Sequence, residues 1–356
     1  MNSNSPLNID DFLKTLQNKI NVPLGSIQKG SLTTFNAIQK GTAVSMTAIQ
    51  SILQNRGRLQ SVINGIIGDT LDKTKSRLAI KMSLIGNVCD DAGKICILVH
   101  GLCASEDSWQ FSDDPQTTYG SLLIKDFGYS PFYLRYNSGL HISTNGRLLN
   151  RHINRLCNNR SQKIREIIFI GHSLGGLVIR SACHYGMKSN SNWTRRVKKI
   201  FLLGTPHHGS DVEKLGNLTT TVLKIIPNHV THGISHLGNK RSAGIKDLRF
   251  GYLLDEDWKG HDQDALLKDN RHPVPLLKAV DYYIIAGTIS KKSNNLFAQY
   301  FGDGMVNSNS VTGKSFKKSK HIHFLPKYFR TFKGISHAKL SCHADVYDQI
   351  KKWCRA

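Results

Sequence analysis

One stretch of the chain decides its fold: Glu166-Ile-Ile-Phe-Ile-Gly-His-Ser173-Leu-Gly-Gly-Leu-Val-Ile-Arg180. Its four apolar residues 167–170 form the short run expected of a strand that is buried on both faces of a parallel sheet. The next five residues match the pattern G-x-S-x-G, in which a serine occupies a sharp turn between a strand and a helix. Apolar residues then recur at helical spacing. The order of strand, tight turn and helix predicts that Ser173 is a nucleophile on a strained backbone.

A second apolar run, Ile95–Val99, lies upstream of this serine and ends in His100-Gly-Leu102. A serine that carries out acyl transfer needs backbone N–H donors directed at the developing oxyanion. One donor comes from the residue after the nucleophile and one from the loop that follows an earlier strand. Leu174 and Leu102 occupy these two positions. We therefore predict that their N–H groups form an oxyanion hole.

Five motifs along the chain resemble those of the α/β-hydrolase fold, specifically its lipase-like group of bacterial triacylglycerol lipases and GPI inositol-deacylase-like hydrolases. The motifs are His100-Gly-Leu102, Gly171-His-Ser-Leu-Gly-Gly176, Gly204-Thr-Pro-His-His-Gly-Ser210, Gly302-Asp-Gly-Met-Val306 and a terminal histidine segment. The resemblance covers roughly residues 60 to 356. Residues 241–249 are also similar to a phrase in the bacterial inositol-deacylase-like relatives. This resemblance implies an α/β protein with a doubly wound, mostly parallel sheet.

The same resemblance implies the other two members of a catalytic triad, which follow the serine in the order acid and then histidine. Asp303 follows a predicted late strand at 282–287 and occupies the position of the acid. The segment that contains His337 is similar to the family's loop before the last helix, which makes His337 the general base. His343 lies nearer that helix and is the competing assignment, although it is also a candidate helix cap.

Strands and helices alternate along the rest of the chain, as a doubly wound sheet requires. The other predicted elements are helices at 62–71, 119–126, 143–157 and 345–353, and strands at 79–82, 131–136 and 199–203. Residues of about 210–280 interrupt this alternation, and an insertion at that edge of the sheet would cover the serine as a lid. We expect an α/β-hydrolase domain over 61–356, preceded by a helical extension over 1–60.

Residues 12–60 contain a repeat of eleven residues, marked by Ile27-Gln-Lys-Gly, Ile38-Gln-Lys-Gly and Ile49-Gln-Ser-Ile. Eleven residues make nearly three helical turns, so equivalent positions stay on one side of a helix. The isoleucines then share one arc, and the glutamines and lysines share the other. Such a helix could lie on an anionic membrane or lipid-particle surface. It could equally pack on the hydrolase body or on a partner helix.

The composition narrows the classes of partner and compartment. A formal net charge of +23 over 356 residues favours anionic partners, but no nucleic-acid module or basic-aromatic pattern accompanies it, so no nucleic-acid partner is expected. Seven cysteines without close pairs indicate reduced thiols. The first residues lack a secretion signal, and no apolar run reaches the length of a membrane span. We expect a cytoplasmic protein, with peripheral binding to a membrane, lipid or granule surface as an alternative.

No metal or cofactor is expected. His207 and His208 have no further ligand at metal-binding spacing, and they are interpreted as part of a structural turn. His172, which precedes the serine, is expected to support its turn.

These residues predict a serine hydrolase that cleaves carboxylic esters, with lipid esters as the expected substrates, through an acyl-enzyme. Ser173 would attack the acyl carbonyl, His337 would take and return the proton, and Asp303 would orient His337. An acyltransferase with the same triad is an alternative. A non-catalytic scaffold on a lipid or granule surface, with a hydrolase body, is another. A protein that binds nucleic acid through its charge alone is the third.

Overall fold

The computed structural model describes residues 56–88, 93–158, 164–210, 241–261, 269–288, 322, 324–325 and 328–356. The eleven-residue repeat and Asp303 therefore lie outside the described residues. So does much of the predicted lid, at 211–240 and 262–268.

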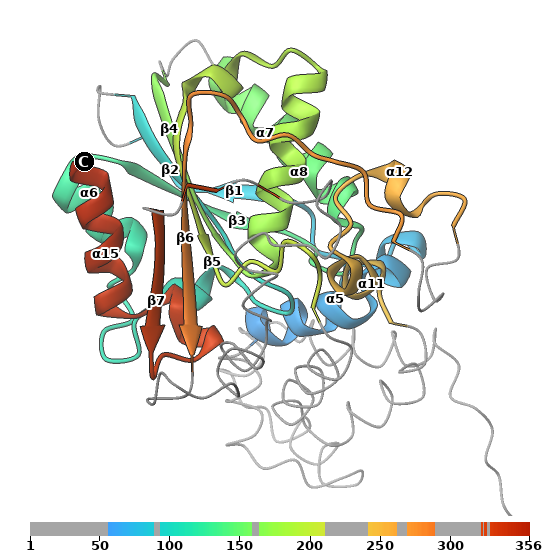
Figure 1. Ribbon diagram of the computed structural model, residues 1–356. Coiled ribbons are helices and arrows are strands. Elements are labelled where there is room, and N and C mark those ends of the chain that lie inside the picture. Colours follow the sequence, from blue (N-terminus) through green and yellow to red (C-terminus); the bar gives the residue numbers. More distant parts are fainter. Residues whose placement is uncertain are drawn as a thin grey trace, which may run out of the picture.

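Seven strands form one sheet in the spatial order β1-β3-β2-β4-β5-β6-β7 (Figure 1). Their bounds are β1 (Ser83–Ile85), β2 (Lys94–Val99), β3 (Ser130–Arg135), β4 (Glu166–His172), β5 (Val197–Leu203), β6 (Asp281–Thr288) and β7 (Phe329–Lys333). β1 pairs antiparallel with β3, and all the other neighbouring pairs are parallel. The predicted fold class, a doubly wound and mostly parallel α/β-hydrolase sheet, is confirmed.

Helices cover both faces of this sheet (Figure 1). The helices α6 (Tyr119–Phe127) and α15 (Ala344–Arg355) lie on one face, and α7 (Ile142–Asn158) and α8 (Leu174–Lys188) lie on the other. Three further helices are α5 (Arg56–Lys73), α11 (Ala243–Phe250) and α12 (Asp255–Trp258). Within the described residues, no helix combines the length and the apolar character that crossing a bilayer would require.

The apolar run of β4 explains why this strand lies at the centre of the sheet. Ile167 and Phe169 pack into the apolar cluster that includes residues of α7 and α8. Ile168 and Ile170 point the other way, into the cluster with α6 and α15. Side chains alternate between the two faces of a strand, so a strand that is covered on both sides must be apolar at every position.

The edge strand differs from the sequence-based expectation. A strand was predicted at 79–82, but β1 comprises Ser83–Ile85. The backbone near residue 80 forms hydrogen bonds with a side chain instead of with a neighbouring strand. The N–H of Ile80 donates to Oδ1 of Asn64 at 2.9 Å, and Nδ2 of Asn64 donates to the carbonyl of Leu78 at 2.8 Å. The apolar residues there pack against α5.

Helix α5 lies against the loop that follows β3 and against the insertion. Asn137 Nδ2 donates to the carbonyl of Gly68 at 2.8 Å, and Ser242 Oγ donates to the carbonyl of Gly65 at 2.7 Å. Helix α11 packs against both α5 and α7. The expected boundary between residues 60 and 61 falls within the described length of α5.

The phenol of Tyr119 connects α6 to the C-terminal segment. Its hydroxyl oxygen lies 2.9 Å from the carbonyl oxygen of Leu340 and 3.0 Å from that of His343, and it accepts the N–H of His343 at 3.0 Å. Tyr119 is fully buried. One side chain early in the chain therefore fixes the backbone on both sides of the junction between a 3₁₀ helix (His337–Ser341) and α15.

Candidate active site

Ser173 joins β4 to α8 in a strained backbone conformation. Its φ is 53° and its ψ is −123°, values that residues with a side chain rarely adopt. Its N–H donates to the carbonyl of Leu203 at 2.8 Å, which ties the turn to β5. A Cβ on Gly175 would overlap the carbonyl oxygen of Val99, so α8 approaches β2 closely only because residue 175 has no side chain. The predicted strand, tight turn and helix are present.

The loop after β2 lies beside this serine. A Cβ built on Gly101 would be 3.2 Å from Cβ of Ser173, so the two backbones are close neighbours. In the described part of the chain, the backbone N–H groups of Leu102 and Leu174 donate to no protein acceptor. Both residues are buried. This arrangement is compatible with the predicted role of these two N–H groups as oxyanion donors.

Buried polar contacts hold the same loop in place. The hydroxyl of Tyr136 donates to the carbonyl of His100 at 2.7 Å, and the two rings stack with centroids 4.4 Å apart. The N–H of Cys103 donates to Ser138 Oγ at 3.1 Å, and Cys103 has a positive φ of 59°. Burial lowers the pKa of His100 to about 4, so this histidine is neutral near pH 7.

His337 is buried at the start of its 3₁₀ helix, against the residue that precedes the serine. Nε2 of His172 lies 3.0 Å from the carbonyl oxygen of His337, and the two ring centroids are 4.9 Å apart. A Cβ on Gly204 would lie 2.8 Å from Cε1 of His337, so the turn after β5 packs directly against the imidazole ring. His172 thus links the serine turn to His337, in keeping with the structural role expected for it.

The competing histidine has a different environment. His343 is the N-cap of α15, where its Nδ1 accepts the N–H of Asp345 at 3.2 Å. Its side chain is partly exposed. Asp303, the predicted acid, lies outside the described residues. The structure therefore brings His337, Leu102 and Leu174 to the serine turn and gives His343 a capping role.

Arg180, a buried cation on α8, was assigned no role from the sequence. Nη1 of Arg180 lies 3.3 Å from Nδ1 of His207, and its Nη2 donates to the carbonyl of Val274 at 3.2 Å. Among the described residues, no carboxylate pairs with Arg180. Burial lowers the pKa of Arg180 to about 10. Burial and the neighbouring Arg180 charge lower the pKa of His207 well below its usual range. His207 is therefore neutral and accepts a hydrogen bond.

This contact joins α8 to the turn at 204–210, whose first residue supports His337. The available sequence signal was an arginine within a helix whose residues 174–179 are apolar or glycine. Its partner is distant in sequence, however, and no local spacing pointed to it. Within the described residues, no group of three histidine, cysteine, aspartate or glutamate side chains could hold a metal ion.

Several solved structures resemble this one. They include the mature lipase BlEst2 of Bacillus licheniformis, with 17% identity, a TM-score of 0.45 and coverage of 77% of this chain and 97% of that one. The esterase Pf2001 of Pyrococcus furiosus has 12% identity, a TM-score of 0.41 and coverage of 78% and 85%. A malate-bound esterase of Thermogutta terrifontis has 13% identity, a TM-score of 0.40 and coverage of 78% and 93%. Likeness at this level says nothing about substrate. No curated protein matches the chain.

A family model gives the firmer result. The model of the PGAP1-like alpha/beta domain matches residues 91–273, slightly more than half of the 356 residues. The matched region runs from β2 through the serine turn and the 204–210 turn into the insertion. Together with the confirmed sheet topology, this match agrees with the branch of α/β-hydrolases that the sequence motifs resemble. The chain belongs to the PGAP1-like alpha/beta domain family.

Proposed function

We propose that the protein is a serine hydrolase that cleaves carboxylic esters, with lipid esters as its substrate class. The strained backbone of Ser173, between the Gly101–Leu102 loop and the tethered His337, is the observation that carries this proposal. Strain of this kind persists where the surrounding structure fixes it, and it is typical of active sites.

In the proposed reaction, Ser173 Oγ attacks the acyl carbonyl carbon while His337 removes the proton of the Ser173 hydroxyl. Asp303 is proposed to hold the tautomer of His337 and to stabilise its charged form. The N–H groups of Leu102 and Leu174 bind the oxyanion of the tetrahedral intermediate, where the loss of one donor typically costs ~3 kcal/mol. His337 then protonates the leaving alkoxide. Water attacks the acyl-enzyme by the same route and releases the carboxylic acid and free Ser173.

We further propose that residues 12–60 bring the protein to an anionic lipid surface. The proposal depends on the eleven-residue repeat and on the net charge of +23. An apolar arc contributes burial in the interface, and lysines on the opposite arc contribute attraction to anionic head groups.

Labelling by a fluorophosphonate probe tests the nucleophile directly. The native protein should be labelled and should release free acid from acyl esters, whereas Ser173→Ala should do neither while its circular dichroism spectrum is unchanged. Ser112→Ala is the matched control, because Ser112 is exposed and its side chain bonds to Asp113 alone among the residues that the structure describes. Labelling that persists in Ser173→Ala and disappears in another serine variant would refute the assignment.

Asp303→Asn should reduce the rate of hydrolysis and leave the fold intact.

A further inference from the structure

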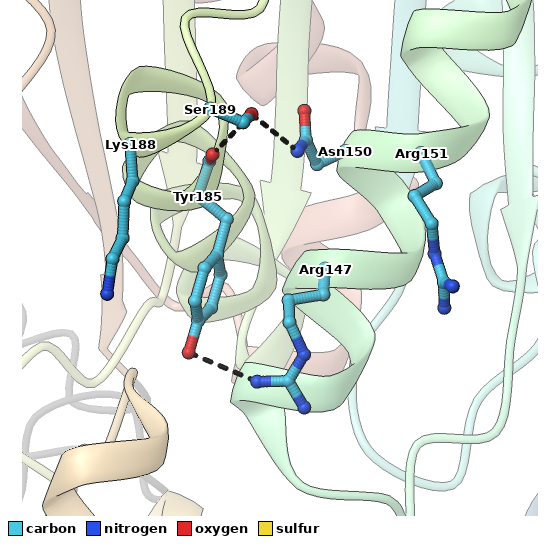
Figure 2. Close-up of a pocket in the computed structure, with 6 residues that line it drawn as sticks. All are labelled: Arg147, Asn150, Arg151, Tyr185, Lys188 and Ser189. Carbon is cyan, nitrogen blue, oxygen red and sulfur yellow. Dashed lines mark hydrogen bonds between the residues drawn. The ribbon is translucent and has the colours of Figure 1, made fainter.

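A polar groove lies between α7 and α8, on the face of the sheet opposite α6 and α15. It has a volume of about 350 Å³ and is lined by Arg147, Asn150, Arg151, Tyr185, Lys188 and Ser189. Figure 2 shows Arg147 and Lys188 on either side of the Tyr185 ring, with Arg151 one turn further along α7. We refer to this site as the α7–α8 groove. Three of its six lining residues are cations, and none of the six is acidic.

The groove is separate from the serine turn. Helix α8 begins directly after Ser173 and ends at Lys188, and its 15 residues span roughly 20 Å at the rise of an α-helix. The groove lies at the far end of that helix. Its cations therefore cannot contact an acyl group attacked by Ser173, and they have no part in the proposed reaction.

The guanidinium of Arg147 is fixed in position before any ligand arrives. It lies 5.2 Å from the centre of the Tyr185 ring, and Nη1 donates to the Tyr185 hydroxyl at 3.2 Å. Nη2 donates to Thr144 Oγ1 at 3.2 Å. A cation that is already ordered loses little side-chain freedom when it binds an anion.

The carboxylates nearby do not neutralise the groove. Asp255 pairs with Arg147 at 2.5 Å but also with Lys259 at 2.8 Å, so two cations share one charge. Glu256 approaches Lys188 at 3.5 Å, and both side chains are at least half exposed, so this pair is weak. Within the described part of the chain, Arg151 pairs with no carboxylate. The groove is therefore lined by one uncompensated and two partly compensated cations.

The polar groups between these cations are neutral. The Tyr185 hydroxyl is at one end, and the Asn150 amide donates to Ser189 Oγ at 3.3 Å at the other (Figure 2). Planar guanidinium groups bind phosphate oxygens in a bidentate way, and an ammonium group adds a point charge. We propose that the α7–α8 groove binds a phosphate monoester group, carried either by a small soluble molecule or by a lipid head group.

The test titrates the full-length protein with inorganic phosphate by calorimetry at low ionic strength. In parallel, it measures co-sedimentation with phosphatidylcholine vesicles that contain phosphatidic acid. The groove variant is Arg151→Glu with Lys188→Glu, and both side chains are exposed. The matched control is Lys125→Glu with Lys352→Glu, which changes the net charge equally on α6 and α15. A milder variant, Arg151→Gln with Lys188→Gln, guards against misfolding of the first.

We expect the groove variants to raise the dissociation constant by about tenfold or more, because two charge-assisted contacts are lost. The control variant should change it less than about twofold if the contacts are local. A groove-dependent loss in the phosphate arm alone identifies a soluble ligand, and a loss in the vesicle arm alone identifies a lipid head group. Equal effects of the groove and control variants, or no binding in either arm, would overturn the proposal.

Discussion

Residue 173 has an unfavourable backbone conformation that its neighbours impose. The N–H of Ser173 is bound by Leu203, and α8 is pressed against β2 at Gly175. The cost of a non-glycine residue in such a region is about 1–3 kcal/mol. The packing of β4 and α8, whose residues are mostly buried, offsets this cost, which is why the turn does not relax.

Gly175→Ala is the sharpest test of this packing. Its Cβ would overlap the Val99 carbonyl oxygen and lie 2.6 Å from that of His100, and these backbone atoms belong to the end of β2 and the start of the loop that follows it. We expect the free energy of unfolding to fall by about 1–3 kcal/mol and ester hydrolysis to be lost. Gly57→Ala is the control, because among the described residues no atom beyond its chain neighbours and its own helix backbone lies within 4 Å of that Cβ, and alanine favours the helix. Urea denaturation and an ester assay report both effects.

A pH dependence of stability follows from His100. Its folded pKa of about 4 lies below the unfolded value near 6.5, so the unfolded chain binds the extra proton as pH falls. The stability contributed by neutral His100 is complete above pH 6.5 and is lost between pH 6.5 and 4. From pH 7 to pH 5 the expected loss is about 2 kcal/mol.

The His100→Gln variant should show a smaller difference in urea midpoint between pH 7 and pH 5 than the native protein. His261→Gln, at an exposed position, is the control. Each protein is compared with itself at the two pH values. Any loss of stability from the substitution that does not depend on pH therefore cancels. An unchanged pH difference in His100→Gln would show that another group carries the acid sensitivity.

At the scale of elements, the start of α15 separates two histidines that are close in sequence. His343 caps the helix, and His337 lies against His172, the residue before Ser173. His343→Ala should lower the free energy of unfolding by about 1 kcal/mol, the usual value of an N-cap, and leave ester hydrolysis nearly unchanged.

His337→Ala should abolish hydrolysis, with fluorophosphonate labelling falling in parallel. The two variants are compared by kcat/KM and by urea denaturation. Loss of activity in His343→Ala at unchanged stability would reverse the two assignments.

The elements that could be predicted were those with a strong local pattern. The run at 167–170 and the glycines around Ser173 are sufficient for β4 and α8, because burial on both faces leaves few alternatives. The edge strand was placed a few residues early, since the apolar residues near 80 pack on α5 and a distant Asn64 occupies their backbone. The contact between Arg180 and His207 was missed for a similar reason. Its two partners meet only after the sheet has formed, and neither residue has a distinctive neighbourhood in the sequence.

At the scale of the whole molecule, the net charge of +23 and the repeat in residues 12–60 lead to one prediction. Deleting residues 1–55, just before α5, should reduce binding to anionic vesicles and leave hydrolysis of a soluble short-chain ester unchanged. The affinity of the full chain for these vesicles should fall as salt is raised. Vesicle co-sedimentation and an ester assay measure the two properties. Equal vesicle binding by both proteins would place the lipid contact on the hydrolase body.

The Tyr119 hydroxyl binds the backbone of the segment after His337, and this contact has a consequence for synthesis on the ribosome. The proposed base, His337, is synthesised about 160 residues after Ser173. Tyr119, which binds the segment after His337, is synthesised before both of them. At typical translation rates that interval is roughly 10–30 s. Throughout that interval, the nascent chain contains Ser173 without the histidine that is proposed to activate it.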